Sequence, residues 1–396
     1  MNDLRLLAQA GCLLLLGCAL SSPPAHAQLA QLQPLQELEP DDAEVFPTPD
    51  ELVPVGFGTD VAIEGNRAFI SMPEADRSAG RIAIFHREAS GEWRRAGQLR
   101  FPGTPNGVRQ IELQGGIAIA ASQDTLYVFR PKTSNGMPPV RKLKVDARDF
   151  ISDLEYDGQT AVVGTSGGVY VFTINQRTIA RQQKIISPSG LASDAFGSSV
   201  AVFGDTLIVG APGYNDSQGA VHVYRLRGTK WVRTQTLLAP DGEAFDGFGT
   251  ALTVRHGLMV VGAPGADPAY EGEFGEVLRM GAAFLFAPRA DRWLQTRKLT
   301  PLDDGMQAYL NFGSHIEING GRVVIGSPGI RGLSFEAGSL FVYERQGNKL
   351  SALAQAIESN ELGYAFAVWG TSVIAGIVEP TFFTGRALVF DLNVTQ

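Results

Sequence analysis

The stretch that decides the fold runs from Phe196 to Tyr224 and reads FGSSVAVFGDTLIVGAPGYNDSQGAVHVY. It contains three short apolar runs, separated by a tight turn at Gly204-Asp205 and by a Gly/Pro/Asn/Asp loop from Gly210 to Gly219. Short β-branched runs bounded by such residues are typical of strands, and a two-residue turn between two of them indicates a hairpin. A fourth run, Trp231 to Leu238, follows, and a second Phe-Gly then begins the pattern again at Phe248. The stretch therefore predicts a unit of four antiparallel strands that repeats.

The unit occurs seven times along the chain. Its third strand keeps a Gly or Asp five residues before an aromatic residue, first from Gly80 to Phe85 and last from Gly385 to Phe390. Each copy begins near a Phe-Gly pair or its remnant, and we expect the copies to start near residues 56, 106, 150, 196, 248, 312 and 364. Seven four-stranded units of this length predict an all-β fold, a seven-bladed β-propeller of antiparallel blades.

The last unit is incomplete, because the chain ends at Gln396, just after the third strand of that unit. The segment from Leu32 to Asp42 resembles the segment from Thr234 to Gly242, which forms the fourth strand of an internal unit. We therefore expect a strand at about residues 29–40 to complete the last blade. A ring closed in this way has no open sheet edge.

Composition limits the choice of partner. The chain has 396 residues, a net charge of −8 and a pI near 5.3, which argues against nucleic acid or anionic lipid as the main partner. After the leader, no apolar run is long enough to span a bilayer. We expect one propeller domain over residues 28–396, a monomer without a cofactor.

The first 27 residues predict a secretory signal peptide. An apolar segment from Leu4 to Leu20 is followed by Ala25-His26-Ala27, an A-x-A cleavage site. We expect cleavage near Ala27 and a secreted or periplasmic protein. The alternative is a lipoprotein anchored through Cys18, because Leu15-Leu16-Gly17-Cys18 resembles a lipobox.

The Phe-Gly and Gly-Ala-Pro pairs within Phe196–Pro212 and Phe248–Pro264, with a Gly-Ser-Pro variant in Phe312–Pro328, resemble the FG-GAP repeat. This family builds the seven-bladed propeller of integrin α subunits and of many bacterial secreted proteins. The resemblance covers about Leu32 to Gln396 and is strongest in units four to six. It implies the fold and a role in binding other macromolecules, as in cell adhesion, and it implies no reaction.

The chain departs from the calcium-binding form of that repeat, which carries an Asp-x-Asp-x-Asp-Gly-like loop between strands one and two. Here the corresponding connections, such as Gly204-Asp205 and His256-Gly257, are tight turns with at most one carboxylate. Calcium needs six to eight oxygen ligands, so we expect no metal site in these turns. A weak site among Asp241, Glu243 and Asp246, in the connection before the fifth blade, stays open.

No catalytic constellation is visible in the sequence. The mature histidines show no metal-binding spacing, and there is no G-x-S-x-G motif. We therefore expect a protein without enzymatic activity. The alternative is a hydrolase or lyase that uses loop carboxylates, because glycosidases need only two suitably spaced acids.

Binding is expected on the face formed by the connections between strands two and three and between strand four and the next blade. These connections are the long ones, and the connection from Gly265 to Met280 is the longest. Aromatic and Arg side chains on loops of a rigid scaffold are typical binding residues. The candidates are Tyr214, Tyr270, Glu273, Phe274, Arg279, Arg331, Phe335, Phe382 and Phe383. The expected partner is a protein or glycan at or outside the cell envelope.

Overall fold

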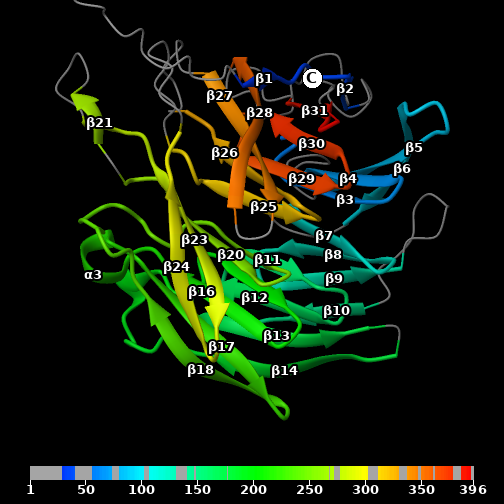
Figure 1. Cartoon of the computed structure of the whole chain (residues 1–396). Coiled ribbons are helices and arrows are strands. Elements are labelled where there is room, and N and C mark those ends of the chain that lie inside the picture. Colours follow the sequence, from blue (N-terminus) through cyan, green and yellow to red (C-terminus); the bar gives the residue numbers. More distant parts are fainter. Residues whose placement is uncertain are drawn as a thin grey trace, which may run out of the picture.

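The computed structural model describes residues 29–40, 56–73, 80–101, 107–130, 141–146, 149–175, 177–266, 268–271, 277–301, 311–329, 337–346, 349–359, 362–377 and 385–393. These residues form seven four-stranded antiparallel blades arranged as a β-propeller (Figure 1), which confirms the predicted fold class. The predicted signal peptide and the lipobox Cys18 lie outside the described residues.

Blades one to four each follow the chain order of their strands. Blade one contains β3 (Val61–Glu64), β4 (Arg67–Met72), β5 (Arg81–Arg87) and β6 (Trp93–Arg100). Blade two contains β7 (Gln110–Gln114), β8 (Ile117–Ser122), β9 (Thr125–Phe129) and β10 (Arg141–Lys144). Blade three contains β11 (Ile151–Tyr156), β12 (Thr160–Thr165), β13 (Gly168–Ile174) and β14 (Ile179–Ile185). Blade four contains β15 (Val200–Phe203), β16 (Thr206–Ala211), β17 (Ala220–Arg227) and β18 (Lys230–Leu237).

The last three blades include the exceptions. Blade five contains β19 (Leu252–Arg255), β20 (Leu258–Ala263), β23 (Ala282–Arg289) and β24 (Arg292–Leu299), with a small sheet of β21 (Pro268–Glu271) and β22 (Val277–Arg279) between its second and third strands. Blade six contains β25 (His315–Asn319), β26 (Arg322–Ser327), β27 (Ala337–Gln346) and β28 (Lys349–Ser359). Blade seven contains β29 (Ala365–Trp369), β30 (Ser372–Ile377), β31 (Arg386–Asp391) and the N-terminal β2 (Gln36–Leu38). Two short helical turns, η1 (Ala192–Asp194) and α3 (Tyr214–Ser217), lie in connections of blade four.

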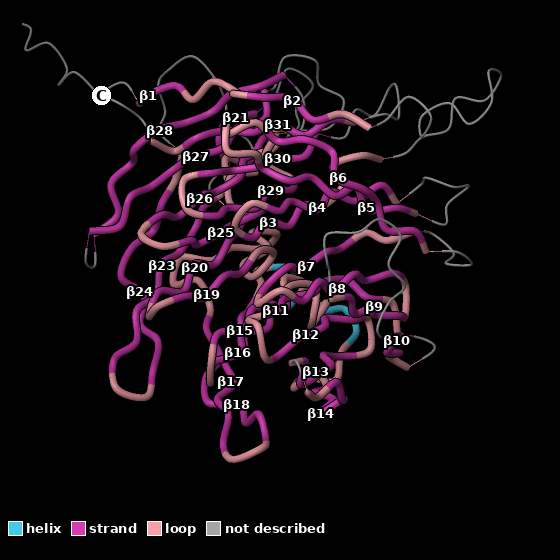
Figure 2. Tube along the Cα trace, turned by 90° about the vertical axis from the view of Figure 1, so that its right-hand side faces the viewer, coloured by secondary structure: helices cyan, strands magenta, loops and turns pink. Residues whose placement is uncertain are grey.

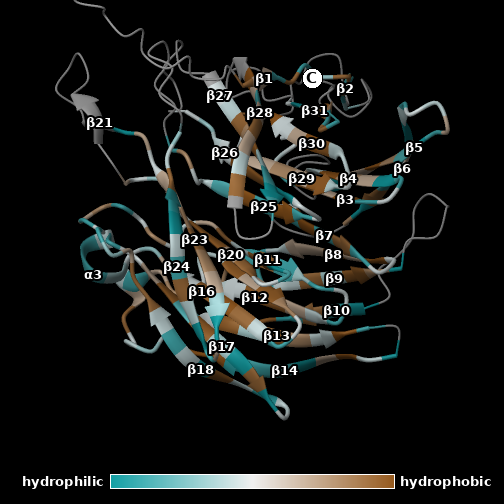
Figure 3. Cartoon of the chain, in the orientation of Figure 1, coloured by the Kyte–Doolittle hydropathy of each residue, from teal (hydrophilic) through white to brown (hydrophobic). Residues whose placement is uncertain are grey.

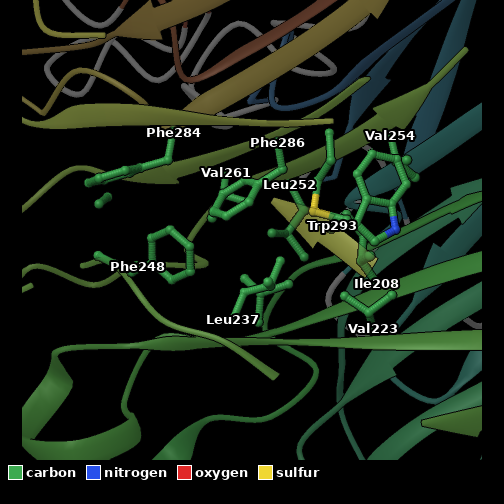
Figure 4. Packing of buried hydrophobic residues seen from close by; sticks show 14 of the residues in the cluster. Ile208, Val223, Leu237, Phe248, Leu252, Val254, Val261, Phe284, Phe286 and Trp293 are labelled. Atoms are coloured by element: carbon green, nitrogen blue, oxygen red, sulfur yellow. The ribbon is translucent and has the colours of Figure 1, made fainter. Parts of the chain in front are cut away.

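The core lies between neighbouring blades, because each sheet is covered on both faces. Second strands such as β16 are buried along their whole length, as the absence of apolar/polar alternation in their sequences predicts. Figure 4 shows one such layer, in which Phe248, Phe284 and Trp293 of blade five pack toward Ile208 and Val223 of blade four. Figure 3 shows the same concentration of apolar residues in the inner strands.

The Phe-Gly and Gly-Ala-Pro motifs meet across the joint between blades. The carbonyl oxygen of Gly249, in the Phe-Gly turn of blade five, comes so close to Gly210 of blade four that a Cβ on Gly210 would lie 2.2 Å from it. The Phe side chain of the turn is buried, and Gly249 has φ +96°, which glycine adopts without strain. The glycine of the Gly-Ala-Pro motif therefore leaves room for the Phe-Gly turn of the next blade.

In two blades, the structure departs from the repeat pattern that the sequence predicts. In blade seven, Leu362-Gly363 takes the Phe-Gly position, two residues before the Tyr364-Ala365 pair that the repeat pattern suggests; Leu362 is fully buried and Gly363 has φ +108°. In blade three, Phe150 is in register but 63% exposed. Ile151 replaces the turn glycine there, and a β-branched residue resists positive φ, so the turn takes another course.

The N-terminal segment closes the ring, as predicted. Strand β2 pairs antiparallel with β31, so that Gln36 lies opposite Val389. Gln36 Nε2 donates to the Trp93 carbonyl of blade one at 2.7 Å, and Trp93 N donates to Gln36 Oε1 at 2.8 Å. Gln235 makes the same pair of bonds with Trp293, between blades four and five. The closing strand thus joins blade seven to blade one as an internal fourth strand joins its neighbour.

The start of the same segment extends blade six, which the sequence did not indicate. Strand β1 (Ala30–Gln31) pairs parallel with β28, and Leu32 N donates to Gln355 O at 2.7 Å. Figure 1 shows β1 and β2 in blue beside the orange β28 and the red β31, and Figure 2 shows the same neighbours from the side. The outer edge of β28 is therefore covered by the N-terminal segment.

Replacing Gln36 by Ala should destabilise the closed ring. The change leaves the Trp93 backbone groups without their side-chain partners, which we expect to cost about 1–3 kcal/mol of unfolding free energy. Chemical unfolding of Gln36→Ala, beside the internal control Gln235→Ala, measures this cost. Similar losses in both variants are expected. A stable Gln36→Ala protein beside a destabilised Gln235→Ala protein would contradict the role of the N-terminal strand.

Candidate functional site

The surface formed by the 2–3 and 4–1 connections, here called the loop face, contains two of the sequence-predicted residues whose side chains are described. Tyr214, in α3, is half-buried and packs against the core between blades three and four. Arg279 Nη1 donates to Gly265 O at 2.6 Å and lies 3.7 Å from Asp246 Oδ1. Arg279 thus ties the base of the longest loop to the neighbouring connection.

For the other predicted residues, the structure does not describe the side chains. Tyr270 belongs to β21, where its backbone pairs with Leu278 of β22. Outside the described ranges lie Glu273, Phe274, Arg331, Phe335, Phe382 and Phe383. Their part in binding stays a prediction.

The described loops of blades four and five form a tightly connected unit. Asn215, Asp216 and Ser217 all have positive φ, between 51° and 63°, so that they form a left-handed turn. Phe245 N donates to Asp216 O at 3.1 Å, and Gly247 N donates to Ser217 O at 2.8 Å. Consecutive left-handed residues are costly, and backbone strain of this kind is concentrated at functional sites.

Exposed apolar side chains gather on the 4–1 connections. Of the ten large hydrophobic residues that are exposed in the described part of the chain, six lie in these connections. They are Phe150, Ile186, Leu191, Leu238, Phe245 and Tyr364. Sequence reasoning missed them because it searched the long 2–3 loops. The signal was available for Phe150, an aromatic residue followed by Ile in place of the turn glycine.

An open pocket of about 670 Å³ lies among three of these side chains. Phe150, Ile186 and Leu191 line it and are 63%, 71% and 59% exposed. The minimal 2–3 connection of blade three, at Ser166-Gly167, also lines the pocket. The pocket can accept an apolar side chain or a similarly sized apolar group.

A second pocket, of about 280 Å³, lies in the central channel and is lined by the first strands of all seven blades. Two of its carboxylates connect neighbouring blades: Asp60 accepts from Ile111 N at 2.7 Å, and Asp153 accepts from Val200 N at 2.6 Å. Burial raises the pKa of Asp60 to about 7 and that of Asp153 to about 6, although these backbone bonds oppose the shift. These two acids satisfy backbone groups on the inner edge of the next blade.

Three glutamates occupy one register position of the first strands and line the same pocket: Glu112, Glu155 and Glu317. Arg255 of blade five reaches past blade four, where it donates to Val202 O at 3.3 Å, and pairs with Glu155 at 2.8 Å. Burial raises the pKa of Glu155 to about 7 and of Glu317 to about 8, and it raises the pKa of Glu112 well above its usual range. The channel therefore favours protonated carboxyls.

The sequence held a signal for these glutamates that the repeat analysis did not use. Each stands between two apolar residues of a first strand, as in Ile111-Glu112-Leu113 and Ile316-Glu317-Ile318. First strands line the axis of a propeller, so a polar residue at one register position of several units indicates the channel.

The acids of the connection before blade five do not converge. Asp241 pairs with Lys298 at 2.7 Å, while Asp246 accepts from Glu243 N at 2.8 Å and faces Arg279. Within the described ranges, no group of three or more His, Cys, Asp or Glu side chains is placed to hold a metal ion. No helix in the same ranges is long and apolar enough to cross a membrane.

Comparison with known proteins agrees with the repeat pattern. Residues 180–224 and 231–286 match the FG-GAP repeat family. Integrin alpha-2 from Bos taurus is 25% identical over an alignment of 187 residues, and the match covers 42% of this chain and 14% of the integrin. Integrin alpha-2 from Mus musculus is 32% identical over an alignment of 89 residues, and that match covers 21% of this chain and 7% of the integrin. The matches thus support an integrin-like FG-GAP repeat and span a small part of these relatives.

A solved structure supports the fold over the whole chain. A chain in the crystal structure of the mitotic checkpoint complex superposes with a TM-score of 0.59 at 8% sequence identity, over 97% of this chain and 99% of that one. At this identity the likeness concerns the fold alone.

Excess calcium should leave the melting temperature unchanged, because the acids before blade five are bound to Lys298, to Arg279 and to backbone. Saturation of a site at a hundred times its Kd would add about 2.7 kcal/mol of stability. Thermal unfolding with calcium and with chelator measures this. A rise with calcium that the chelator reverses would show that a site exists.

Stability should fall as the pH rises from 6.5 to 8. A carboxyl whose folded pKa lies above its unfolded value contributes stability at low pH, and this contribution is lost as the pH passes the folded pKa; for Asp60, Glu155 and Glu317 these values are about 7 to 8. Burial lowers the pKa of His222 and of His315 to about 4. Their contribution to the stability of the fold is therefore lost only below pH 6.5, outside this range.

The variant Glu317→Gln tests this interpretation, because it removes one of these groups. Its unfolding free energy at pH 8 should exceed that of the wild type by on the order of 1 kcal/mol, allowing for the water that reaches a side chain about one third exposed. Its dependence on pH should be flatter. Equal pH slopes in both proteins would contradict the assignment.

Proposed function

We propose that this protein is a secreted or envelope-associated, non-enzymatic β-propeller that binds a protein or glycan partner through its loop face. The observation that carries the proposal is the gathering of exposed apolar side chains on the 4–1 connections. Exposed apolar groups concentrated on one surface are typical of interaction sites. The leader with its Ala25-His26-Ala27 site supports secretion.

The chemistry of the pocket favours a protein over a glycan at this position. Phe150, Ile186 and Leu191 offer apolar surface to the pocket, and the described residues that line it include no charged side chain. An apolar side chain that enters such a pocket is the usual anchor of a protein interface. The connected loops of blades four and five, with the exposed Phe245, extend the same surface across the joint.

The resemblance to FG-GAP propellers agrees with a binding role. The matched relatives are integrin alpha subunits, and the repeat supplies a scaffold on which loops vary without loss of the fold. The described sheets hold the 4–1 connections between two blades, so the surface needs little ordering when a partner binds.

A triple replacement tests the proposed surface. In Phe150→Ser/Leu191→Ser/Phe245→Ser, we expect loss of partners that the wild-type protein retains from the extracellular and envelope fractions of its own organism. Truncation of hot-spot residues costs about 2 kcal/mol or more each, so retention should fall below detection. Quantitative mass spectrometry of the retained proteins is the measurement.

The control is Val232→Ser/Leu294→Ser, which removes two apolar side chains of the outer strands that are 46% and 44% exposed. It should retain the same partners as the wild type. Identical partners on the wild type and on the triple variant would place binding elsewhere.

A hydrolase or lyase is the second candidate function, and the raised pKa values in the channel are the observation that favours it. Glu112 and Glu317 are candidates for a protonated acid at neutral pH, as a general acid must be. The double variant Glu112→Gln/Glu317→Gln would abolish turnover of a glycoside or polyuronate substrate, if the wild type shows any, and leave partner binding unchanged.

A further inference from the structure

The outer strands of blades one to five carry positive charge alone. Strands β6, β10, β14, β18 and β24, here called the basic belt, contain thirteen Lys and Arg residues and no Asp or Glu. Yet acids outnumber bases in the whole chain, 41 to 33. Figure 3 shows long hydrophilic stretches on β10 and β24.

Hydrogen bonds join the strands of the belt from blade two to blade five. Arg141 Nη1 of β10 donates to Ile179 O of β14 at 2.8 Å. Gln183 of β14 and Gln235 of β18 each bond the backbone of a Trp at the start of the next outer strand. The cations therefore lie along a single arc of the circumference, and at one end of that arc's strands Lys184 and Lys298 reach acids of the loop face.

Protection of sheet edges explains part of this pattern. A charged side chain on an edge strand prevents pairing with another chain. That requirement is met by charge of either sign, however, and it does not account for the absence of acids. Within the described part of the chain, ion pairs with acids on neighbouring turns and connections are formed by Arg94, Lys144, Arg181, Lys184 and Lys298.

A recess of about 550 Å³ interrupts the belt between blades four and five. Its charged lining consists of Arg225, Arg227 and Arg292 together with Asp205 and Asp291. Arg225 is held by Asp205 at 2.7 Å and by Thr206 at 2.6 Å. Arg227 and Arg292, which end β17 and begin β24, are exposed at the rim. Two guanidinium groups beside a recess are suited to a carboxylate or sulfate, which arginine binds through paired N–H donors.

The shape of the belt selects among anionic partners. A flat bilayer touches a convex circumference over a short arc, and duplex DNA, with a persistence length of about 50 nm, resists bending around a small domain. Single-stranded nucleic acid is held largely by stacking on aromatic rings, but the aromatic residues of the five strands, Trp93, Trp231 and Trp293, are only 2–4% exposed. A flexible linear polysaccharide with acidic groups meets all these conditions.

We propose that the basic belt binds a linear anionic polysaccharide, with one of its acidic groups in the recess formed by Arg227 and Arg292. This site is separate from the loop face and does not depend on the function proposed for that face. It would allow the propeller to associate with an acidic glycan matrix while its loop face binds another partner.

The test uses the full chain with heparin and polygalacturonate as probes, which carry sulfates and carboxylates respectively. Binding is measured by calorimetry at low and at high salt. Arg227→Gln/Arg292→Gln should weaken binding by about tenfold and lower its salt dependence. The control Arg67→Gln/Arg322→Gln removes the same charge from second strands of blades one and six and should change affinity by less than about twofold.

The loop-face variant Phe150→Ser/Leu191→Ser/Phe245→Ser should bind both polysaccharides like the wild type, which separates this proposal from the previous one. Unchanged melting temperatures exclude a folding defect. Three results would overturn the proposal: no binding of either probe at low salt, equal losses in the belt and control variants, or tighter binding to duplex DNA or to anionic phosphatidylglycerol vesicles than to both polysaccharides.

Discussion

The structure depends on a close backbone contact between neighbouring blades. At five of the seven joints, a glycine of one second strand faces the carbonyl oxygen of a glycine in the next blade, and a Cβ on the first glycine would lie 1.9–2.2 Å from that oxygen. The contact between blades seven and one, Gly376 to Gly58, is of the same kind as the contact between Gly210 and Gly249. Glycine therefore permits the close backbone contact that sets the spacing between neighbouring blades. The apolar layers and the Gln–Trp backbone hydrogen bonds stabilise the blades at that spacing.

A closed ring of this kind separates three surfaces by chemistry. The channel collects carboxyls, because the inner edges of the first strands carry backbone N–H groups that Asp60 and Asp153 satisfy. The 4–1 connections collect exposed apolar side chains, and the outer strands of five blades collect bases. The net charge of the chain does not indicate this separation, because it is the sum over an acidic channel and a basic circumference.

The periodic part of the sequence predicted most of the fold. Seven repeats, the antiparallel four-stranded unit and the N-terminal closing strand could be recognised because each position recurs and its role can be compared between copies. What could not be predicted is where one copy departs from the others. Phe150 is exposed because Ile151 resists the positive φ of the turn glycine that it replaces. Arg255 reaches Glu155 because the fold brings together residues 100 positions apart. The bases of the outer strands are present in the sequence, but the overall charge of −8 does not reveal that they share one surface.

The most direct test of these glycine contacts is the unfolding free energy of Gly376→Ala beside that of Gly321→Ala. Both changes add one methyl group. At Gly376 it would lie 1.9 Å from Gly58 O, whereas at Gly321 the nearest neighbouring atom would be Arg345 O at 3.8 Å. We predict a loss of several kcal/mol for Gly376→Ala, as backbone clashes in a packed site produce, and a change within about 0.5 kcal/mol for Gly321→Ala. Equal stability of the two variants would contradict the claim that glycine contacts set the joints of the ring.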